Sequence, residues 1–551
     1  MRRRIRAALV ALAILVAMFP ACRQPDTTAD LSKLPPGGPP RGQSTPPSTR
    51  TTTLPSGQVA NLPARAELPP EIVEVVRLAP GESIEGRESV KLGPGGHRIV
   101  ATVLTVKDVV VYQGDRPDPQ RYRALACLTF SPVGEVAYLG LVDGSWCLFR
   151  NGAIVGDRPY LTDPYSELGK LVWSPLGTSL ASVTWRDRRR WHIVRDGLHV
   201  GVDYDECDQP AFSPDDQSFA FAARWGQKHF VVRGGRRVGG LYDWVAPPLF
   251  TPDGCSVMFV AAEGDRCFVV KDGVRVSRRY KGGAWLLLSP SGRSFALWVY
   301  QGWGTECPRP GVGRQYVVKN DRRMGGSYHG VRDMTFSAEG EVLAFAASLP
   351  CERSAAKRSE GNDEAEVIEP GRLSRGMVVV KDGEMVGQPY TRVGRPVLSR
   401  DGRSIAFRAY VDEGDVVREF VIKDGVAVHE EILRLPARLD SFSAATLLCL
   451  GPDGRSLAYD AAAAPYLRRV IWDGRQIGDE YHEVRYLTIS PDGRTLMFMA
   501  KRGGKEFYVR NGKRVGHEYD WVTPPQTSLD RTKFIFAGVV GNAIYRNEVP
   551  W

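Results

Sequence analysis

From about residue 93 to the C-terminus, short runs of alternating hydrophobic and polar residues follow one another at a regular spacing. Residues 256–262 and 267–271 are two such runs, with the period of two that is typical of a strand with one buried face. No long stretch shows the 3.6-residue period of an amphipathic helix. The pattern therefore predicts an all-β protein built from many short strands.

A turn motif introduces these runs: a hydrophobic pair, then Ser-Pro-Asp-Gly. Good copies begin at Ser213, Thr251 and Ser490. Degenerate copies, which bring the total to eleven, begin at Gly93, Ser131, Ser174, Ser289, Ser337, Ser399, Gly451 and Ser528. An Asp at this position can cap the turn through bonds to backbone N–H groups. Because the Asp recurs at one place in many copies, we interpret it as a turn cap and not as a catalytic or metal-binding carboxylate.

About 21 residues after each copy comes a second turn, Asp-Gly or Asn-Gly, as at Asp272 and Asn511. These dipeptides supply the positive φ that tight hairpins require. A segment Val-Gly-x-x-Tyr-Asp follows and predicts an outer strand. Four short antiparallel strands in about 38 residues make one β-propeller blade, so the chain is expected to form about eleven blades.

The sequence Ser213 to Phe221 is an example of the pattern Ser-Pro-Asp-x-x-x-hydrophobic-Ala-Phe. This pattern resembles the TolB-type, WD-repeat-like propeller repeats of bacterial envelope proteins. The resemblance extends from Gly93 to the C-terminus and implies a propeller that serves as a binding platform. It does not imply a particular ligand.

Eleven blades exceed the four to eight of an ordinary ring, so two rings are predicted. The distance from the second turn to the next copy is 17 residues, except for the overlong 151 to 174 and 424 to 451. If the chain crosses between rings there, residues 166–440 form a six-blade ring, and residues 71–165 with 441–551 form a five-blade ring. The strand-like segment 71–78 would complete the last blade. A sequential split near residue 284 is the alternative, and a single large ring is less favoured.

Insertions between the first and second turns are confined to three consecutive blades, which begin at Ser289, Ser337 and Ser399. Connections of this kind emerge on the face opposite the two turn types, and elaborated loops on a rigid scaffold commonly carry function. We therefore predict a binding face centred on residues 301–313 and 349–376. Its candidate binding residues are Trp303, the pair Thr305 and Glu306, Arg309, Glu352 and Arg353.

The N-terminus has the features of an export signal. Four arginines precede an apolar run from Ala7 to Phe19 that is too short to span a bilayer. Cys22 follows in a context that resembles a bacterial lipobox, with Phe19 and Pro20 departing from the usual residues. We predict a signal peptide at 1–21, lipidation of Cys22 and a disordered Pro/Thr/Ser-rich tether at 22–70. The protein is then exported and lipid-anchored in the cell envelope, periplasmic or at the cell surface; ordinary secretion is the alternative.

The formal charge is +10, and it falls to +6 once Arg2, Arg3, Arg4 and Arg6 leave with the leader. Because no basic run interleaved with aromatics appears, a nucleic-acid partner is not expected. Nucleophile-elbow, phosphate-loop and metalloprotease motifs are absent from the sequence. His329 and His482 occupy equivalent connections, and we interpret them as solvated loop residues. No cofactor or metal is predicted.

Cys307 and Cys351 fall in the two longest insertions, and in an oxidising compartment a disulfide between them is expected. Two free thiols are the alternative. Buried thiols in or beside strands are expected at Cys127, Cys147, Cys255, Cys267 and Cys449. Cys207 is expected on a loop.

Two functions remain open from the sequence. The first is a non-catalytic scaffold that binds a protein, peptide or glycan. The second is a propeller-type lyase or hydrolase that acts on an extracellular polymer. An enzyme should gather carboxylates, His or Lys with perturbed pKa values in a channel, whereas a scaffold should show turn-bound carboxylates and an elaborated rim.

Overall fold

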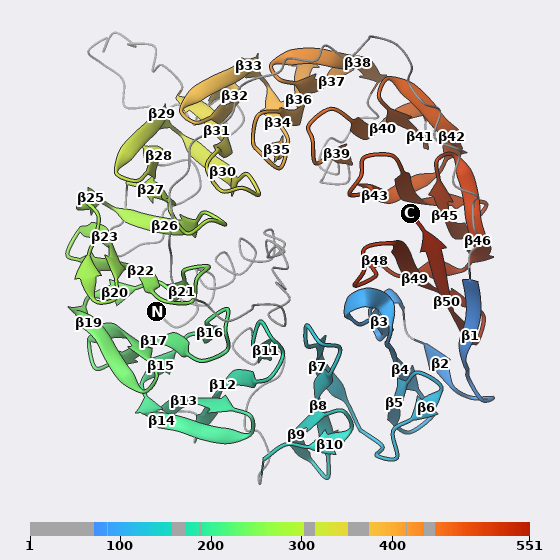
Figure 1. Ribbon diagram of the computed structural model, residues 1–551, viewed down its shortest axis with the longest axis horizontal. Helices are drawn as coiled ribbons and strands as arrows, with labels where there is room; N and C mark the ends of the chain where they lie inside the picture. The colour runs from blue at the N-terminus through green and yellow to red at the C-terminus, as the bar shows by residue number, and fades with distance from the viewer. Residues whose placement is uncertain are drawn as a thin grey trace, which may run out of the picture.

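A computed structural model describes residues 71–84, 86–156, 171–186, 190–301, 314–350, 374–414, 416–434, 447–464 and 466–551. Its strands form eleven antiparallel sheets, which lie around one central opening (Figure 1). We number these blades 1 to 11 in chain order, from β2–β6 in blade 1 to β47–β50 in blade 11. The prediction of an all-β propeller with eleven four-stranded blades is confirmed.

The inner strand of each blade lines the opening and is often broken in two. The inner strands are β2 (Ser83–Ile84) with β3 (Val90–Leu92), β7 (Leu125–Phe130), β11 (Val172–Trp173), β15 (Glu206–Cys207) with β16 (Ala211–Phe212), β20 (Trp244–Val245) with β21 (Leu249–Phe250), β26 (Gly283–Leu288), β30 (Gly330–Phe336), β34 (Arg392–Val393) with β35 (Val397–Leu398), β39 (Leu448–Leu450), β43 (Glu483–Ile489), and β47 (Trp521–Val522) with β48 (Gln526–Thr527). Two short 3-10 helices, η1 (Arg87–Ser89) and η2 (Pro94–Gly96), flank β3.

The second and third strands form the centre of each blade. The second strands are β4 (Ile99–Leu104), β8 (Val136–Val142), β12 (Leu180–Arg186), β17 (Phe219–Trp225), β22 (Val257–Glu263), β27 (Phe295–Tyr300), β31 (Leu343–Pro350), β36 (Ile405–Glu413), β40 (Leu457–Ala464), β44 (Leu496–Arg502) and β49 (Lys533–Val540). The third strands are β5 (Val109–Gln113), β9 (Ser145–Arg150), β13 (Arg190–Arg195), β18 (Lys228–Arg233), β23 (Arg266–Lys271), β28 (Gln315–Lys319), β32 (Ser374–Lys381), β37 (Val416–Lys423), β41 (Leu467–Trp472), β45 (Lys505–Arg510) and β50 (Ala543–Pro550).

The outer strands form the rim. They are β6 (Arg116–Pro117), β10 (Ala153–Ile154), β14 (Leu198–Tyr204), β19 (Arg236–Tyr242), β24 (Val274–Arg275) with β25 (Tyr280–Lys281), β29 (Arg322–Tyr328), β33 (Glu384–Tyr390), β38 (Val426–Arg434), β42 (Arg475–Tyr481), β46 (Lys513–Tyr519) and β1 (Glu71–Arg77).

The Val-Gly-x-x-Tyr-Asp segment corresponds to a bulged outer strand. In blade 4, Gly239 adopts a φ of 77°, and the register of β18 and β19 shifts between the pairs His229–Tyr242 and Val231–Val238. Glycine reaches this φ without a steric penalty, and the bulge turns the following tyrosine inward. Tyr242 is buried, and its hydroxyl accepts a hydrogen bond from the Gly240 N–H at 3.1 Å.

In place of the two predicted rings, the blades form a single ring, so the division into five and six blades is not confirmed. Each pair of consecutive blades shares a buried hydrophobic cluster, including the pairs that flank the two overlong connections. Leu139 of blade 2 packs in one cluster with Leu180 of blade 3, and Val421 of blade 8 with Leu457 of blade 9. A long connection permits a crossing between rings, but these apolar faces are buried only if the neighbours stay adjacent.

The ring closes through the N-terminal strand, as predicted. β1 pairs antiparallel with β50 from Glu71–Glu548 to Arg77–Ala543, which completes blade 11. Val76 of β1 lies in one buried cluster with Val539 and Ile544 of the same blade and with residues of blade 1. Residues nearly 480 positions apart are therefore joined at one seam (Figure 1).

Two of the three predicted insertions, in blades 6 and 7, lie outside the described residues, whereas the third, in blade 8, is described and is not a loop. In blade 8 the additional residues lengthen the strands, so that β36, β37 and β38 have 9, 8 and 9 residues. Other blades have second and third strands of mostly five to seven residues. The prediction of a loop insertion in blade 8 is therefore wrong, because its extra residues extend the β36–β37 ladder as far as the pair Glu413–Val416.

The cysteines follow the prediction in part. Cys267 is buried in β23, while Cys127, Cys147 and Cys449 are half-buried in strands. Two expectations are wrong: Cys255 is exposed in the first turn of blade 5, and Cys207 is buried in β15. The inner strand of blade 4 begins earlier than the sequence suggested and carries Cys207 into the core. Within the described ranges, no helix is long and apolar enough to cross a membrane.

Candidate functional site

The ring has two unlike faces. We call the face that carries the Ser-Pro-Asp-Gly and Asp-Gly turns the turn face, and the face that carries the connections between second and third strands the loop face. The two long insertions leave the loop face from adjacent blades: the Gln301 N–H bonds the Arg314 carbonyl at 3.1 Å in blade 6, and Pro350 pairs with Ser374 in blade 7. The loop face is therefore the irregular one.

The predicted binding residues lie outside the described residues. This applies to Trp303, Thr305, Glu306, Arg309, Glu352 and Arg353. It applies equally to the predicted disulfide between Cys307 and Cys351 and to the lipidation site Cys22, so these assignments remain predictions.

The two insertion bases are linked by one glutamine at the start of β28. Gln315 accepts a hydrogen bond from the Trp298 indole at 2.9 Å and another from the backbone N–H of Val331 at 2.8 Å. Trp298 belongs to blade 6 and Val331 to blade 7. The two blades that carry the long loops are therefore joined by a polar contact directly beneath them.

On the turn face, the aspartates of the first turn are engaged within their own turns, as predicted. Apart from Asp453, which follows Gly451 and accepts the Arg455 N–H at 3.0 Å, each accepts a bond of 2.5–2.7 Å from the Ser or Thr two residues before it, as Asp253 does from Thr251. It also accepts a backbone N–H bond from two residues after it. The hydroxyl donor lowers the pKa of the Asp253 carboxyl, and the same kind of contact lowers the pKa of Asp530 to about 2.

The Asp or Asn of the second turn has a different structural role. Asp272 and Asn511 adopt φ values of 47° and 48°, and their side chains accept the first N–H of the second strand at 2.9 and 2.8 Å. One residue thus forms the hairpin and pairs an N–H that would otherwise have no partner. The side chains of the second turn are therefore also engaged in backbone hydrogen bonds.

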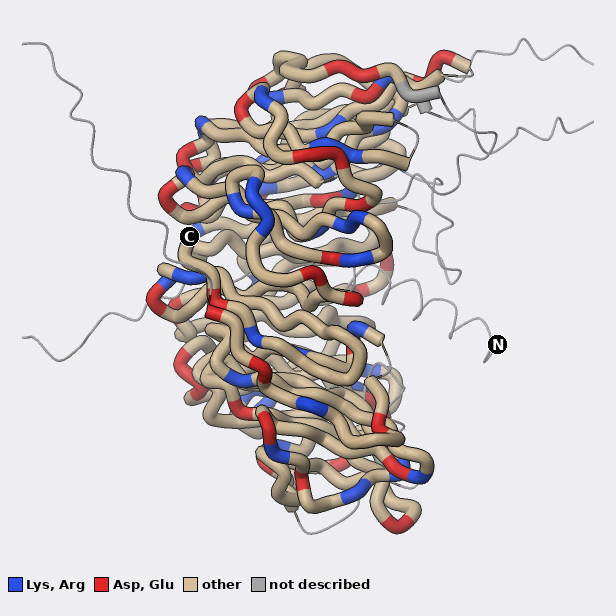
Figure 2. Tube along the Cα trace, turned by 90° about the vertical axis from the view of Figure 1, so that its right-hand side faces the viewer, with Lys and Arg blue, Asp and Glu red and all other residues tan. Residues whose placement is uncertain are grey.

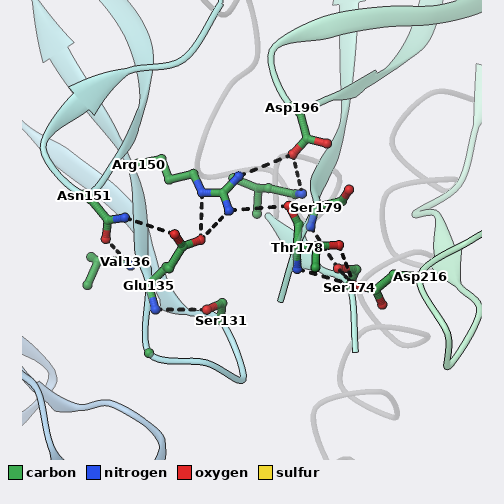
Figure 3. Close-up of polar contacts among 12 residues, drawn as sticks. Ser131, Glu135, Val136, Arg150, Asn151, Ser174, Thr178, Ser179, Asp196 and Asp216 are labelled. Atoms are coloured by element: carbon green, nitrogen blue, oxygen red, sulfur yellow. Dashed lines mark hydrogen bonds and ion pairs between the residues drawn. The ribbon is translucent and has the colours of Figure 1, made fainter. Parts of the chain in front are cut away.

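The basic residue that precedes the second turn connects adjacent blades. Arg150 at the end of β9 contacts Glu135 of its own blade and Asp196 and the Thr178 carbonyl of blade 3 (Figure 3). Similar contacts to the next blade are made by Arg233, Lys319, Lys381, Lys423 and Arg510. The sequence analysis missed this role. The recurrence of Arg or Lys directly before Asp-Gly or Asn-Gly is the signal that could have revealed it.

In blade 3, an aspartate from the neighbouring blade replaces a missing turn cap. Blade 3 has Leu176 at the Asp position, and Asp216 of blade 4 reaches across to it (Figure 3). The Asp216 carboxylate accepts bonds from Ser174 Oγ, from the Leu176 N–H at 3.0 Å, and from both the N–H and Oγ1 of Thr178 at 3.3 and 2.8 Å. Asp216 stands where the motif has Gly, and it keeps the positive φ of 57°.

We predict strong coupling between these two positions. Asp216→Gly removes an acceptor of charge-assisted bonds and should destabilise the protein by about 1–2 kcal/mol, after relief of the positive φ. Leu176→Asp combined with Asp216→Gly recreates the turn of the other blades and should recover most of that loss. A four-variant cycle in denaturant should give a coupling energy above about 1 kcal/mol. Additive effects, within about 0.5 kcal/mol, would contradict the replacement.

One carboxyl group is set apart from the turn-bound ones. Asp208, in the break between β15 and β16, has a pKa raised to about 6 because it is buried and lies near Glu206. Among the described carboxyl groups with a resolved shift, Asp208 alone is raised. A single group of this kind does not form the convergent cluster expected of an enzyme in a propeller channel.

A buried charged cluster lies between blades 8 and 9. Arg408 pairs with Glu419 and contacts Asp460 at 2.7 Å, and the three side chains are 2–4% exposed. Asp460 also accepts bonds from the Leu447 N–H and from Arg468. Every charge in the cluster has an oppositely charged neighbour, and the contact between Arg408 of blade 8 and Asp460 of blade 9 joins the two blades.

A small cavity of about 350 Å³ opens between blades 5 and 6 and is lined by Met258, Lys271, Phe295 and Asp321, among others. It arises where the outer strand of blade 5 is interrupted between β24 and β25. Asp321 bridges the gap by accepting bonds from the Arg278 N–H at 3.1 Å and from the Tyr280 hydroxyl at 2.5 Å. The carboxylate of Asp321, which lines the cavity, is thus already engaged in joining the two blades.

His329 and His482, which occupy equivalent connections, lie before blades 7 and 10 and do not meet. The structure instead brings together His192, His199 and Asp203 of blade 3. The sequence analysis missed this group, although the Asp196–Gly197 hairpin turn between the two histidines was visible. It is the one set of potential metal ligands among the residues with described positions.

The fold and these contacts define an eleven-bladed β-propeller repeat protein. No family model matches its sequence, and no curated protein matches it. Solved structures with a similar fold include a eukaryotic initiation factor, with 12% identity, a TM-score of 0.33, and coverage of 75% of this chain and 98% of that one. They also include TolB from Acinetobacter baumannii, with 12% identity, a TM-score of 0.21, and coverage of 63% and 80%.

A third is the propeller domain of the trilobed protease from Pyrococcus furiosus, with 13% identity, a TM-score of 0.26, and coverage of 56% of this chain and 96% of that one. An oligogalacturonate lyase in complex with manganese has 13% identity and a TM-score of 0.26, with coverage of 62% and 96%.

Proposed function

We propose that the protein is a non-catalytic binding scaffold of the bacterial cell envelope. It is exported, held to a membrane by a lipid on Cys22, and presents its loop face to a protein, peptide or glycan partner. The observation that carries this proposal is the contrast between the faces. The turn-face aspartates already accept hydrogen bonds within their turns, whereas the two longest connections between second and third strands start and end in the adjacent blades 6 and 7, on the loop face.

The charge distribution is consistent with a partner that is not a polyanion. In the side view of Figure 2, Lys and Arg alternate with Asp and Glu along the ring. Many of these charges form pairs, such as Lys228 with Asp243 and Lys505 with Asp520, each involving the motif Asp after a tyrosine. The basic groups are thus largely compensated, unlike those of a nucleic-acid surface.

The enzyme alternative, a lyase or hydrolase that acts on an extracellular polymer, would depend on Asp208. Its raised pKa of about 6 suits proton transfer near neutral pH. Among the described carboxyls with a resolved shift, no second group has a raised pKa, and general acid/base cleavage ordinarily requires a pair. We therefore favour the scaffold.

A loop deletion tests the scaffold proposal. Because Pro350 pairs with Ser374, residues 352–372 can be replaced by an Asn-Gly turn without disturbing the strands. We expect proximity labelling of partners in the native envelope to fall at least about 10-fold. The free energy of unfolding should change by no more than the roughly 0.5 kcal/mol that is typical of surface changes.

The matched control alters the turn face. Gln217, Arg293 and Arg494 occupy one exposed position of the first turn in blades 4, 6 and 10, and changing all three to Glu should leave labelling unchanged. If the control variant loses the partners and the loop deletion keeps them, the loop face is not the binding face. A partner captured by the wild type should also bind directly when both proteins are purified.

A further inference from the structure

We propose that the outer hairpin of blade 3 binds a divalent transition metal, with Zn²⁺ as the preferred ion, through His192, His199 and Asp203. His192 lies on β13, and His199 and Asp203 lie on β14. The Nε2 of His199 is 3.3 Å from Asp203 Oδ1, and the Nδ1 of His192 is 3.7 Å from the same oxygen. All three donor atoms lie within 4.8 Å of one another.

These separations suit a tetrahedral ion. Zn²⁺ binds His nitrogen at about 2.0–2.1 Å and carboxylate oxygen at about 2.0–2.2 Å, so two ligand atoms at the tetrahedral angle lie roughly 3.3–3.5 Å apart. The carboxylate supports the same conclusion, because Asp203 Oδ1 is buried and accepts no hydrogen bond. A buried carboxylate oxygen without a donor is unfavourable, and a cation between the three groups would satisfy it.

The backbone places the ligands on one side of the blade. Val194 pairs with His199, so His192, Val194 and His199 share a face, and Val194 packs against blade 2. The ladder then shifts between Trp191–Tyr204 and Ile193–Val200, which leaves extra residues on β14 and brings Asp203 level with His192. Gly201 allows this bulge with a φ of 80°.

Other blades do not carry this set at the equivalent positions. In blade 6 the places of His192 and His199 are taken by Tyr316 and Arg323, and the guanidinium lies 4.5 Å from the ring centroid. In blade 10 they are taken by Phe507 and Arg514, and Glu518 stands at the place of Asp203 and pairs with Arg514. The blade architecture is thus stable with a cation–π pair there. At the same positions blade 3 has two imidazoles and a carboxylate in place of the cation–π pair.

The donor set selects the metal class. Two imidazole nitrogens and one carboxylate are typical of Zn²⁺ and neighbouring late transition metals, whereas Ca²⁺ and Mg²⁺ require six or more oxygens. Three protein ligands leave one tetrahedral position open, as in zinc sites that bind water or an exogenous donor. The His199 side chain is 40% exposed, so this position faces solvent at the seam of blades 2 and 3.

Metal titration of the full chain, purified without a histidine tag, tests the proposal. We expect one Zn²⁺ per chain by isothermal titration calorimetry. His199→Gln and Asp203→Asn should each weaken binding at least about 100-fold, since loss of an outer-shell partner alone costs roughly 10–100-fold. Addition of Zn²⁺ should raise the unfolding midpoint of the wild type but not of these two variants.

His482→Gln is the matched control, because His482 is an exposed histidine on the connection before blade 10. It should bind Zn²⁺ like the wild type. Since His199 is substantially exposed, His199→Gln should fold normally, which its unfolding midpoint without metal will verify. Equal binding by His199→Gln and wild type, or no stoichiometric binding by wild type, would overturn the proposal. A sulfur-to-metal charge-transfer band with Co²⁺ would also overturn it, by assigning the ion to cysteines.

Discussion

Replacing Arg408 with Leu should destabilise the ring by about 3–5 kcal/mol. The substitution leaves Glu419 and Asp460 buried without their shared cation, and breaking a buried pair by removing one partner has a cost of this size. Arg468 still neutralises part of Asp460, so the uncompensated charge is mainly on Glu419. The loss should appear as a lower denaturant midpoint, with faster hydrogen exchange at the seam of blades 8 and 9.

The control for this prediction lies on the next strand of the same blade. Arg418 pairs with Glu413 and Glu430 on β36–β38, but its side chain is 41% exposed. Arg418→Leu should therefore change stability by less than about 1 kcal/mol. If the two variants were equally stable, the buried cluster would not lock the blades. The double variant Arg408→Met with Glu419→Leu should regain much of the loss, because apolar replacement of a buried pair is often neutral.

Much of the blade could be predicted from local sequence because its turns are local. The aspartates of the first turn and the positive-φ residues of the second follow from contacts within five residues or across one hairpin, as at Asp253 and Asp272. The closing strand was also predictable, since blade 11 lacked an outer strand and residues 71–77 had the pattern to supply one.

The number of rings could not be read from connection lengths. The sequence shows that each blade has apolar faces, but it does not show which blade each face packs against. In the structure Leu139 packs with Leu180, and Val421 packs with Leu457, and these contacts show which blades are adjacent. The role of Asp216 and the metal-ligand group could not be predicted for a related reason. Asp216 acts in another blade's turn, and Asp203 reaches His192 through a bulge that shifts the register.

Val76→Asp should open the ring at the closing seam, with a loss of at least about 3 kcal/mol. Val76 is 3% exposed and packs with Leu78, Val539 and Ile544, so the substitution buries a carboxylate with no cation beside it. Among the described strands, β1 is the one that pairs with this edge of β50. When β1 leaves, the amides of β50 that pair with it become accessible. Hydrogen exchange should therefore accelerate at Arg546 and Glu548 before it does in blades 4 to 7.

Val73→Asp provides the comparison on the same strand. Val73 pairs with Arg546 but is 44% exposed, and an added carboxylate there is solvated, with Arg546 nearby. Its effect should stay within about 1 kcal/mol. If Val76→Asp lost stability uniformly, with exchange rising equally in all blades, the ring would unfold as one unit. Selective exchange at β50 would instead show that a closed ring of eleven blades depends on one seam, where the sequence supplies a single strand from the other end of the chain.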